Sequence, residues 1–262
     1  MIQYTMKCLT FSGYMVDCPH LERAGYGGDG NSSTMSLQTM YDVAPTFTNW
    51  IQTWGDSMRE GGSLAHVGPN PGAGGGGPYW CGFIVQAPWR TYVNYNDPRL
   101  IKNYYPKMKE WFSYVDKYTV DGLLKTWPNT EYRNWYLGDW ATPVGVDQTN
   151  ILSVDAVNNC FISVCYQTMS KIAGILGKEQ DKQVYATKYK ELNPLIHKTV
   201  YDPQQKSYAT GTQIDLIYPM LVGVTPDDKQ PDVRNTLYRV TEERFKGHLA
   251  TGLVGVPVIT EW

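Results

Sequence analysis

Residues 17–30 read DCPHLERAGYGGDG and are the most informative stretch of this 262-residue chain. Three carboxylates, Asp17, Glu22 and Asp29, stand here with Arg23 and Tyr26 among glycines, in a segment too irregular to predict a helix. Polar side chains on a glycine-supported loop are the usual setting of a functional site. Grouped carboxylates raise one another's pKa and an arginine lowers that of its neighbour, so one carboxyl can stay protonated beside ionised ones. General acid catalysis needs that division of roles.

The same three acids also have a purely structural interpretation. Asp17 and Asp29 can be turn or cap residues and Glu22 a solvated charge, which is the commoner fate of an arbitrary triplet of acids. A calcium loop starting at Asp29 is excluded, because Thr34 occupies its glycine position and Met40 its glutamate position. We predict no metal site and no cofactor, since the histidines show no ligand spacing.

Helical periodicity runs through most of the chain. Apolar residues recur at spacings of three and four from Val157 to Leu176, and Gly177 follows as a C-terminal cap. Strand signals are scarce, and no linker-like stretch marks a second domain. We therefore predict an all-α protein in which residues 1–262 form a single domain of antiparallel helix pairs. Further helices are predicted over residues 35–58, 83–95, 98–120, 179–201 with a kink or break at Pro194, 212–223, 231–245 and 250–262.

Composition and charge exclude several classes of function. A net charge of -2 gives no field that would attract nucleic acid. No stretch reaches the roughly 18 apolar residues of a membrane span, and residues 1–7 lack the pattern of a signal peptide. The compartment therefore stays open, with a periplasmic or extracellular location favoured over the cytoplasm. The five cysteines contain no CxxC pair, and Cys160 and Cys165 are predicted to be buried thiols.

Tryptophan and tyrosine are abundant, with 9 Trp and 20 Tyr against 6 Phe. Their flat apolar faces and polar handles suit contacts with sugar rings, although aromatic-rich cores without any ligand are equally compatible with this composition. We predict that Trp89 and Trp135 pack in the core. The glycine run over residues 72–77 has no GK(S/T) after it and no strand before it, so it predicts a loop, not a phosphate site.

Residues 17–30 closely resemble the signature of glycoside hydrolase family 78, commonly written DCPHRERLG(W/Y)xGD. The resemblance covers nearly the whole chain and continues in GFIVQAPWRTYVNYND (82–97), LGDW (137–140), YATGTQ (208–213) and HLATG (248–252). It implies an (α/α)6 toroid of the six-hairpin glycosidase kind, incomplete at one or both ends, with an acidic pocket where the interhelix loops converge. It also implies inverting cleavage of terminal α-L-rhamnosyl bonds.

The resemblance implies a role for each matched position. Glu22 matches the family's general acid, and Asp17 and Asp29 match carboxylates that hold the hydroxyls of L-rhamnose. Tyr26 falls where the family has an aromatic ring against the sugar. The residues implied to bind substrate are Arg23, Tyr26, Trp80, Asp139 and Trp140.

Two departures and one absence limit this reading. Leu21 replaces the arginine usual in the motif and Ala24 replaces a leucine, which leaves the exact sugar open. The family's water-activating base is a glutamate in a Trp-Glu motif downstream of the HLATG-like segment, and Glu261-Trp262 has the reverse order. We expect a catalytic-domain fragment that is inactive by itself. Three other acids read as loop or helix-cap residues: Asp147, Asp155 and Asp215.

Two alternatives remain. The chain could be a non-catalytic carbohydrate-binding protein of the same fold, or another α/α-toroid glycosidase or lyase with a different sugar specificity. A truncated toroid would also leave apolar helix faces uncovered, which predicts self-association.

Overall fold

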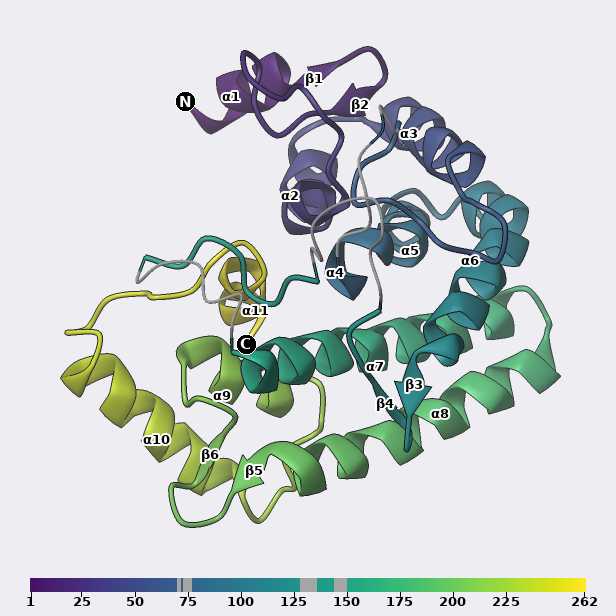
Figure 1. Ribbon diagram of the computed structural model, residues 1–262. Helices are drawn as coiled ribbons and strands as arrows, with labels where there is room; N and C mark the ends of the chain where they lie inside the picture. Colours follow the sequence, from purple (N-terminus) through teal and green to yellow (C-terminus); the bar gives the residue numbers. More distant parts are fainter. Residues whose placement is uncertain (70–71, 73–76, 128–135, 144–149) are drawn as a thin grey trace. The chain divides into compact units, whose positions relative to one another are not determined.

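The computed structural model describes residues 1–69, 72, 77–127, 136–143 and 150–262 (Figure 1). The chain divides into two compact units. Unit 1 comprises Met1–Tyr118, Trp127–Trp135 and Ile172–Gly177, and unit 2 comprises Thr119–Thr126, Tyr136–Lys171 and Lys178–Trp262. Helices dominate both, and the strands among the described residues form three two-stranded hairpins. The prediction of an all-α protein is therefore confirmed.

Unit 1 is built around a core of aromatic rings. The ring of Phe83 lies 4.5 Å from that of Trp50 and 5.5 Å from that of Trp54, measured between centroids. Helices α2, α3 and α6 all pack against α5, which carries Phe83. The elements of this unit are α1 (Ile2–Leu9), β1 (Thr10–Phe11), β2 (Tyr14–Met15), α2 (Gly27–Met40), α3 (Ala44–Asp56), α4 (Pro78–Cys81), α5 (Phe83–Tyr95) and α6 (Arg99–Lys117).

The single helix predicted over residues 35–58 is in fact two helices, α2 and α3. Pro45 stands in the first turn of α3 and has no backbone N–H to donate, so an uninterrupted helix is disfavoured there. Helix α2 also begins at Gly27, so the irregular segment predicted over residues 17–29 ends in a helical turn. Its glycine-rich start has poor helix propensity. Tertiary packing overrides this, because a Cβ on Gly30 would lie 2.5 Å from the ring of Phe83.

Unit 2 follows the predicted helices closely. Of the kink or break predicted at Pro194, the break is absent, because helix α8 continues through this residue. The C-terminal helix begins at Gly255, later than predicted. Cys160 and Cys165 are fully buried, as predicted. None of the described helices has the length and apolar character needed to cross a membrane. The elements are β3 (Thr119–Val120), β4 (Leu123–Leu124), α7 (Ile151–Ile175), α8 (Glu179–Val200), β5 (Tyr201–Asp202), β6 (Ser207–Tyr208), α9 (Gln213–Leu221), α10 (Gln230–Glu243) and α11 (Gly255–Glu261), the last turn of α7 belonging to unit 1.

Candidate functional site

Residues 17–29, here called the acid loop, are closed by contacts within the loop itself. The backbone N–H of Asp17 donates to the carbonyl of Ala24 at 3.1 Å, and the N–H of Ala24 donates to Asp17 Oδ1 at 3.0 Å. Arg23 adopts a left-handed backbone conformation with a φ of 53°, and its exposed side chain donates from Nε to the carbonyl of Pro19 at 2.9 Å. One oxygen of Asp17 and the guanidinium of Arg23 therefore help to shape the loop.

A second segment, residues 66–68, fixes the end of the acid loop. The N–H of Gly27 donates to the carbonyl of His66, and the N–H of Gly68 donates to the carbonyl of Gly25, both at 3.0 Å. The approach is close enough to require glycine at residue 27, since a Cβ there would lie 2.1 Å from the carbonyl oxygen of Trp80. The glycines of the motif thus allow backbone to pack on backbone.

Glu22 is exposed at the surface of the acid loop and is contacted by Tyr26. The Tyr26 hydroxyl donates a hydrogen bond to Glu22 Oε2. Burial raises the pKa of Tyr26, and so do the hydrogen bond to Glu22 and the charges of Glu22, Asp17 and Asp29. Because all three carboxylates act on one hydroxyl, they share one electrostatic environment, and the structure brings the three predicted acids together.

His66 is a member of this site that sequence reasoning missed. Its ring is 2% exposed and stacks on that of Tyr26, with the centroids 5.2 Å apart and the planes 22° from parallel. A single histidine without ligand spacing, on a segment distant in sequence, carries no signal that could have placed it there.

Asp29 lies in the first turn of α2 and holds its proton unusually tightly. Burial raises its pKa to about 6, a hydrogen bond with its own backbone opposes the shift, and the charges of Asp17 and Glu22 add to it. The cluster therefore contains a carboxyl with raised proton affinity, but burial is the main cause, and the predicted repulsion between grouped carboxylates contributes less. Above about pH 6 the carboxylate is ionised, partly desolvated and able to accept strong hydrogen bonds.

Asp29→Asn is expected to stabilise the chain above pH 6. Because the folded-state pKa of about 6 exceeds the ordinary 3.8, the folded chain binds this proton more tightly than the unfolded chain does. Asp29 therefore destabilises the fold progressively as the pH rises through this window, and removing its charge should gain about 1 to 3 kcal/mol.

Urea unfolding of wild type and variant, with the exposed Asp42→Asn as control, measures this difference at about pH 4 and at about pH 7.5. The gain in the free energy of unfolding should be present only at about pH 7.5. An equal gain at both pH values would contradict the raised pKa of Asp29.

Three of the four other motifs, LGDW, YATGTQ and HLATG, meet in unit 2 around residues 248–255. Gly252 N–H donates to Asp139 Oδ2 at 2.8 Å, while the N–H groups of Val254 and Gly255 donate to Oδ1 at 3.0 and 2.9 Å. The side-chain amide of Gln213 accepts from the N–H of Ala250 at 2.7 Å and donates to the carbonyl of residue 248 at 3.1 Å. Asp139 and Gln213 thus anchor the segment that contains the HLATG run.

Asp139 therefore has a structural role that the sequence did not indicate. Burial raises its pKa, against the three backbone donors that lower it. Oδ2 accepts one of the three hydrogen bonds and keeps a lone pair, so a contact with substrate stays a prediction. Trp140 is half-buried, and its carbonyl accepts from the N–H of Leu253 at 2.7 Å.

Trp80 is 3% exposed and packs against the start of α2. A Cβ on Gly28 would lie 2.5 Å from its Nε1 atom, so the indole covers the turn that carries Asp29. The structure places Trp80 beside the acid loop, and its role in binding substrate stays a prediction. Trp89 lies half-buried against Tyr92. Trp135, Asp147 and most of the glycine run over residues 72–77 lie outside the described residues.

Of the two described acids predicted to be loop or cap residues, Asp215 caps a helix as expected, whereas the prediction for Asp155 is wrong, because it lies inside α7 beyond its first turn. Asp215 Oδ2 accepts from the N–H and hydroxyl of Thr210 at 3.1 and 2.6 Å, and Asp215 lies in the first turn of α9. Asp155 lies near the start of α7 and pairs with Lys125 at 3.1 Å. Among the described residues, no group of three or more His, Cys, Asp and Glu side chains could hold a metal ion.

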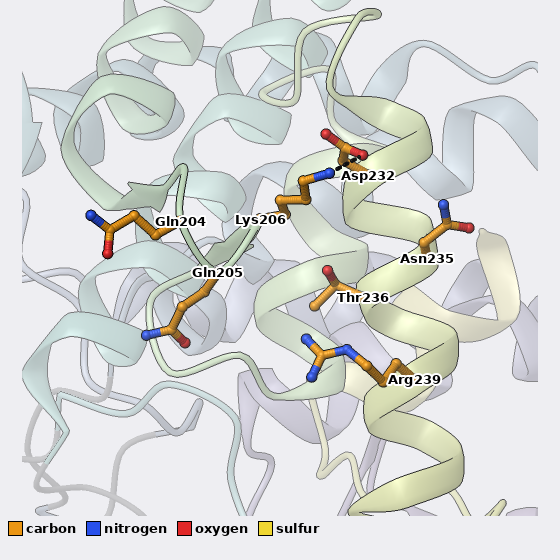
Figure 2. Close-up of a pocket in the computed structure, with 7 residues that line it drawn as sticks. All are labelled: Gln204, Gln205, Lys206, Asp232, Asn235, Thr236 and Arg239. Carbon is orange, nitrogen blue, oxygen red and sulfur yellow. Dashed lines mark hydrogen bonds and ion pairs between the residues drawn. The ribbon is translucent and has the colours of Figure 1, made fainter.

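A separate polar pocket of about 530 Å³ lies in unit 2, between the β5–β6 turn and α10 (Figure 2). The one acid among its lining residues, Asp232, is paired with Lys206 at 2.8 Å. This pocket therefore lacks the group of three carboxylates found in the acid loop. Its lining residues are Gln204, Gln205, Lys206, Asp232, Asn235, Thr236 and Arg239.

Known proteins resemble this chain along its whole length. The family model described as the bacterial alpha-L-rhamnosidase 6 hairpin glycosidase domain matches residues 1–262. An alpha-L-rhamnosidase of Formosa agariphila is 22% identical over 249 residues, which cover 94% of this chain but 26% of that protein. The chain thus spans about a quarter of the length of the curated relatives it matches.

Solved structures agree with this match. The alpha-L-rhamnosidase from Dictyoglumus thermophilum has a TM-score of 0.84 and 26% identity, covering 95% of this chain and 28% of its own. The Streptomyces avermitilis alpha-L-rhamnosidase, solved with L-rhamnose, has a TM-score of 0.79 and 20% identity, covering 99% of this chain and 25% of its own. The six-hairpin fold class that the family resemblance implied is confirmed. The chain belongs to the family of bacterial α-L-rhamnosidase six-hairpin glycosidase domains.

Proposed function

We propose that this chain contains the general acid and the sugar-orienting carboxylates of an enzyme that hydrolyses terminal α-L-rhamnosyl bonds with inversion. The observation that carries the proposal is the arrangement of the acid loop. An exposed carboxyl, Glu22, is held by Tyr26 at the family's acid position, in one electrostatic environment with Asp17 and Asp29.

Glu22 is proposed as the proton donor. Its exposure lets it reach the glycosidic oxygen of a bound substrate, and transfer of its proton lets the C1–O bond break with the electron pair passing to the leaving oxygen. Water then attacks C1 from the opposite face. Inversion requires a second carboxylate to activate that water, roughly 6.5 to 9.5 Å from the acid. We assign that role to none of the three acids of the loop.

Asp17 and Asp29 are proposed to orient the sugar. Asp17 uses Oδ1 to close the loop, which holds its carboxylate in place. Asp29 is partly buried, so a hydrogen bond from a sugar hydroxyl to its ionised carboxylate is screened less by water. A protein of the same fold was solved with L-rhamnose, which supports this sugar as the ligand.

The proposal is tested with the protein expressed from the whole gene. Incubated with an aryl α-L-rhamnoside, it should release L-rhamnose, and proton NMR should detect the β-anomer first. First appearance of the α-anomer would contradict inversion. In a panel of aryl glycosides that differ only in the sugar, preference for another sugar would favour a different glycosidase. Binding of L-rhamnose without any hydrolysis would favour a non-catalytic carbohydrate-binding protein.

A further inference from the structure

Tyr26 is held more firmly than the carboxyl that it contacts. Its ring stacks on the buried ring of His66, and its backbone forms an antiparallel bridge with Val67. The next residue, Gly27, donates to the carbonyl of His66 at 3.0 Å. Tyr26 is therefore attached through its ring and its backbone to the 66–68 segment.

Glu22, in contrast, has few restraints of its own. Its side chain is exposed, it precedes Arg23 with its left-handed backbone, and its N–H donates weakly to Cys18 Sγ at 3.2 Å. An exposed glutamate samples several side-chain rotamers, and fixing it carries an entropic cost. The side-chain hydrogen bond that the structure gives to this carboxyl comes from Tyr26.

We infer that Tyr26 is the positioning residue of Glu22, through its hydroxyl and not only through its ring; this inference rests on the proposed function. Donation to Oε2 leaves Oε1 to carry the transferable proton. When that proton passes to the leaving oxygen, Glu22 becomes a carboxylate, and a hydrogen bond to a charged acceptor is stronger than one to a neutral carboxyl. The Tyr26 contact therefore strengthens as the bond breaks, so it favours the transition state over the bound substrate.

Tyr26→Phe keeps the ring on His66 and removes the hydroxyl. In the protein expressed from the whole gene, it should lower kcat/KM about 10- to 30-fold for an alkyl rhamnoside, whose poor leaving group depends on the acid. The loss should be at most about threefold for an aryl rhamnoside with an electron-withdrawing group, because that leaving group needs little protonation. Tyr41→Phe is the control, since it removes another hydrogen-bonding hydroxyl of unit 1, one that donates to the backbone carbonyl of Gln3 at 2.8 Å.

A double-mutant cycle separates positioning from a structural effect. In a Glu22→Gln background, Tyr26→Phe should change the rate for the alkyl rhamnoside by no more than about twofold, because no proton donor remains to be positioned. Equal losses on both substrates, or an undiminished loss in the Glu22→Gln background, would overturn the inference.

A measurement on the 262-residue chain keeps the inference separate from the proposed function. With 13C-labelled tyrosine, the Tyr26 Cζ resonance, assigned by its loss in Tyr26→Phe, should shift in Glu22→Gln, because the hydroxyl then donates to a neutral amide oxygen instead of a carboxyl oxygen. Glu60→Gln, at an exposed position outside the acid loop, should leave the resonance in place. If Glu22→Gln also leaves it in place, the contact is absent and the inference falls. If the resonance shifts but the whole protein releases no rhamnose, the contact stands and the proposed function falls.

Discussion

Glu22→Gln is expected to lower kcat/KM for an alkyl rhamnoside by about 10²- to 10⁴-fold in the protein expressed from the whole gene, the range that general acid catalysis contributes. Glutamine has nearly the same shape as glutamate, and its amide oxygen can accept the hydrogen bond from Tyr26 that Glu22 accepts. The amide has no proton to give to a leaving oxygen. The variant therefore removes the chemistry while it leaves the acid loop in place.

Two further measurements distinguish a lost proton donor from a disturbed site. The affinity for L-rhamnose, measured by calorimetry, should change by no more than about threefold, since Asp17 and Asp29 are proposed to hold the sugar. An aryl rhamnoside with a good leaving group should lose less activity than the alkyl one. Glu60→Gln, at an exposed position, serves as control. Full activity of Glu22→Gln would overturn the assignment of Glu22.

The proximity of the three acids could be predicted from the sequence because they lie close together in the chain. Asp17 Oδ1 accepts from the N–H of Ala24, and Asp29 lies in the first turn of α2. Glu22 accepts from Tyr26 of the same loop, so the motif itself contains most of what brings the three acids together. His66 could not be found in this way. It reaches Tyr26 only because residues 66–68 pair with the end of the loop, and a pairing between distant segments leaves no local pattern.

The aromatic residues show the same limit. Their abundance was compatible with a sugar-binding surface or with a core, and the described tryptophans favour the core. Trp50, Trp54 and Trp111 are all fully buried, and Trp80 is nearly so. Composition reports how many flat rings the chain has. Which of them face a ligand depends on tertiary packing, such as the glycine start of α2 that lets Trp80 cover it.

The role of Asp139 is where the prediction from sequence and the structure differ most. The LGDW motif indicated a residue that binds substrate, yet its carboxylate is directed at three backbone N–H groups of residues 252–255. Those donors include the N–H of Gly255, the first residue of α11, and a helix start has no intrahelical partners for its first N–H groups. A side chain from a distant loop satisfies them, and this could be recognised only once the backbone was in place.

Asp139→Ala is accordingly expected to destabilise unit 2 by about 3 to 5 kcal/mol, because it leaves three part-buried N–H groups without their acceptor. This is a large fraction of the roughly 5 to 15 kcal/mol by which a native protein is stable. The anchored segment also contains Gly252, which has no room for a Cβ, since one would lie 1.9 Å from the carbonyl oxygen of Trp140. Losing Asp139 should therefore loosen the whole 248–255 segment.

Asp139→Asn distinguishes the acceptor atoms from the charge. Its amide oxygen can replace Oδ1 as acceptor for Val254 and Gly255, while its NH2 group would face the N–H of Gly252. Burial raises the pKa of Asp139, so the charge is unfavourable there and its removal offsets part of the lost hydrogen bond. We expect Asp139→Asn to lose less than half of the free energy of unfolding that Asp139→Ala loses. Urea unfolding of both variants, with the exposed Asp227→Asn as control, measures this, and equal losses for Asn and Ala would show that the charge itself holds the loop.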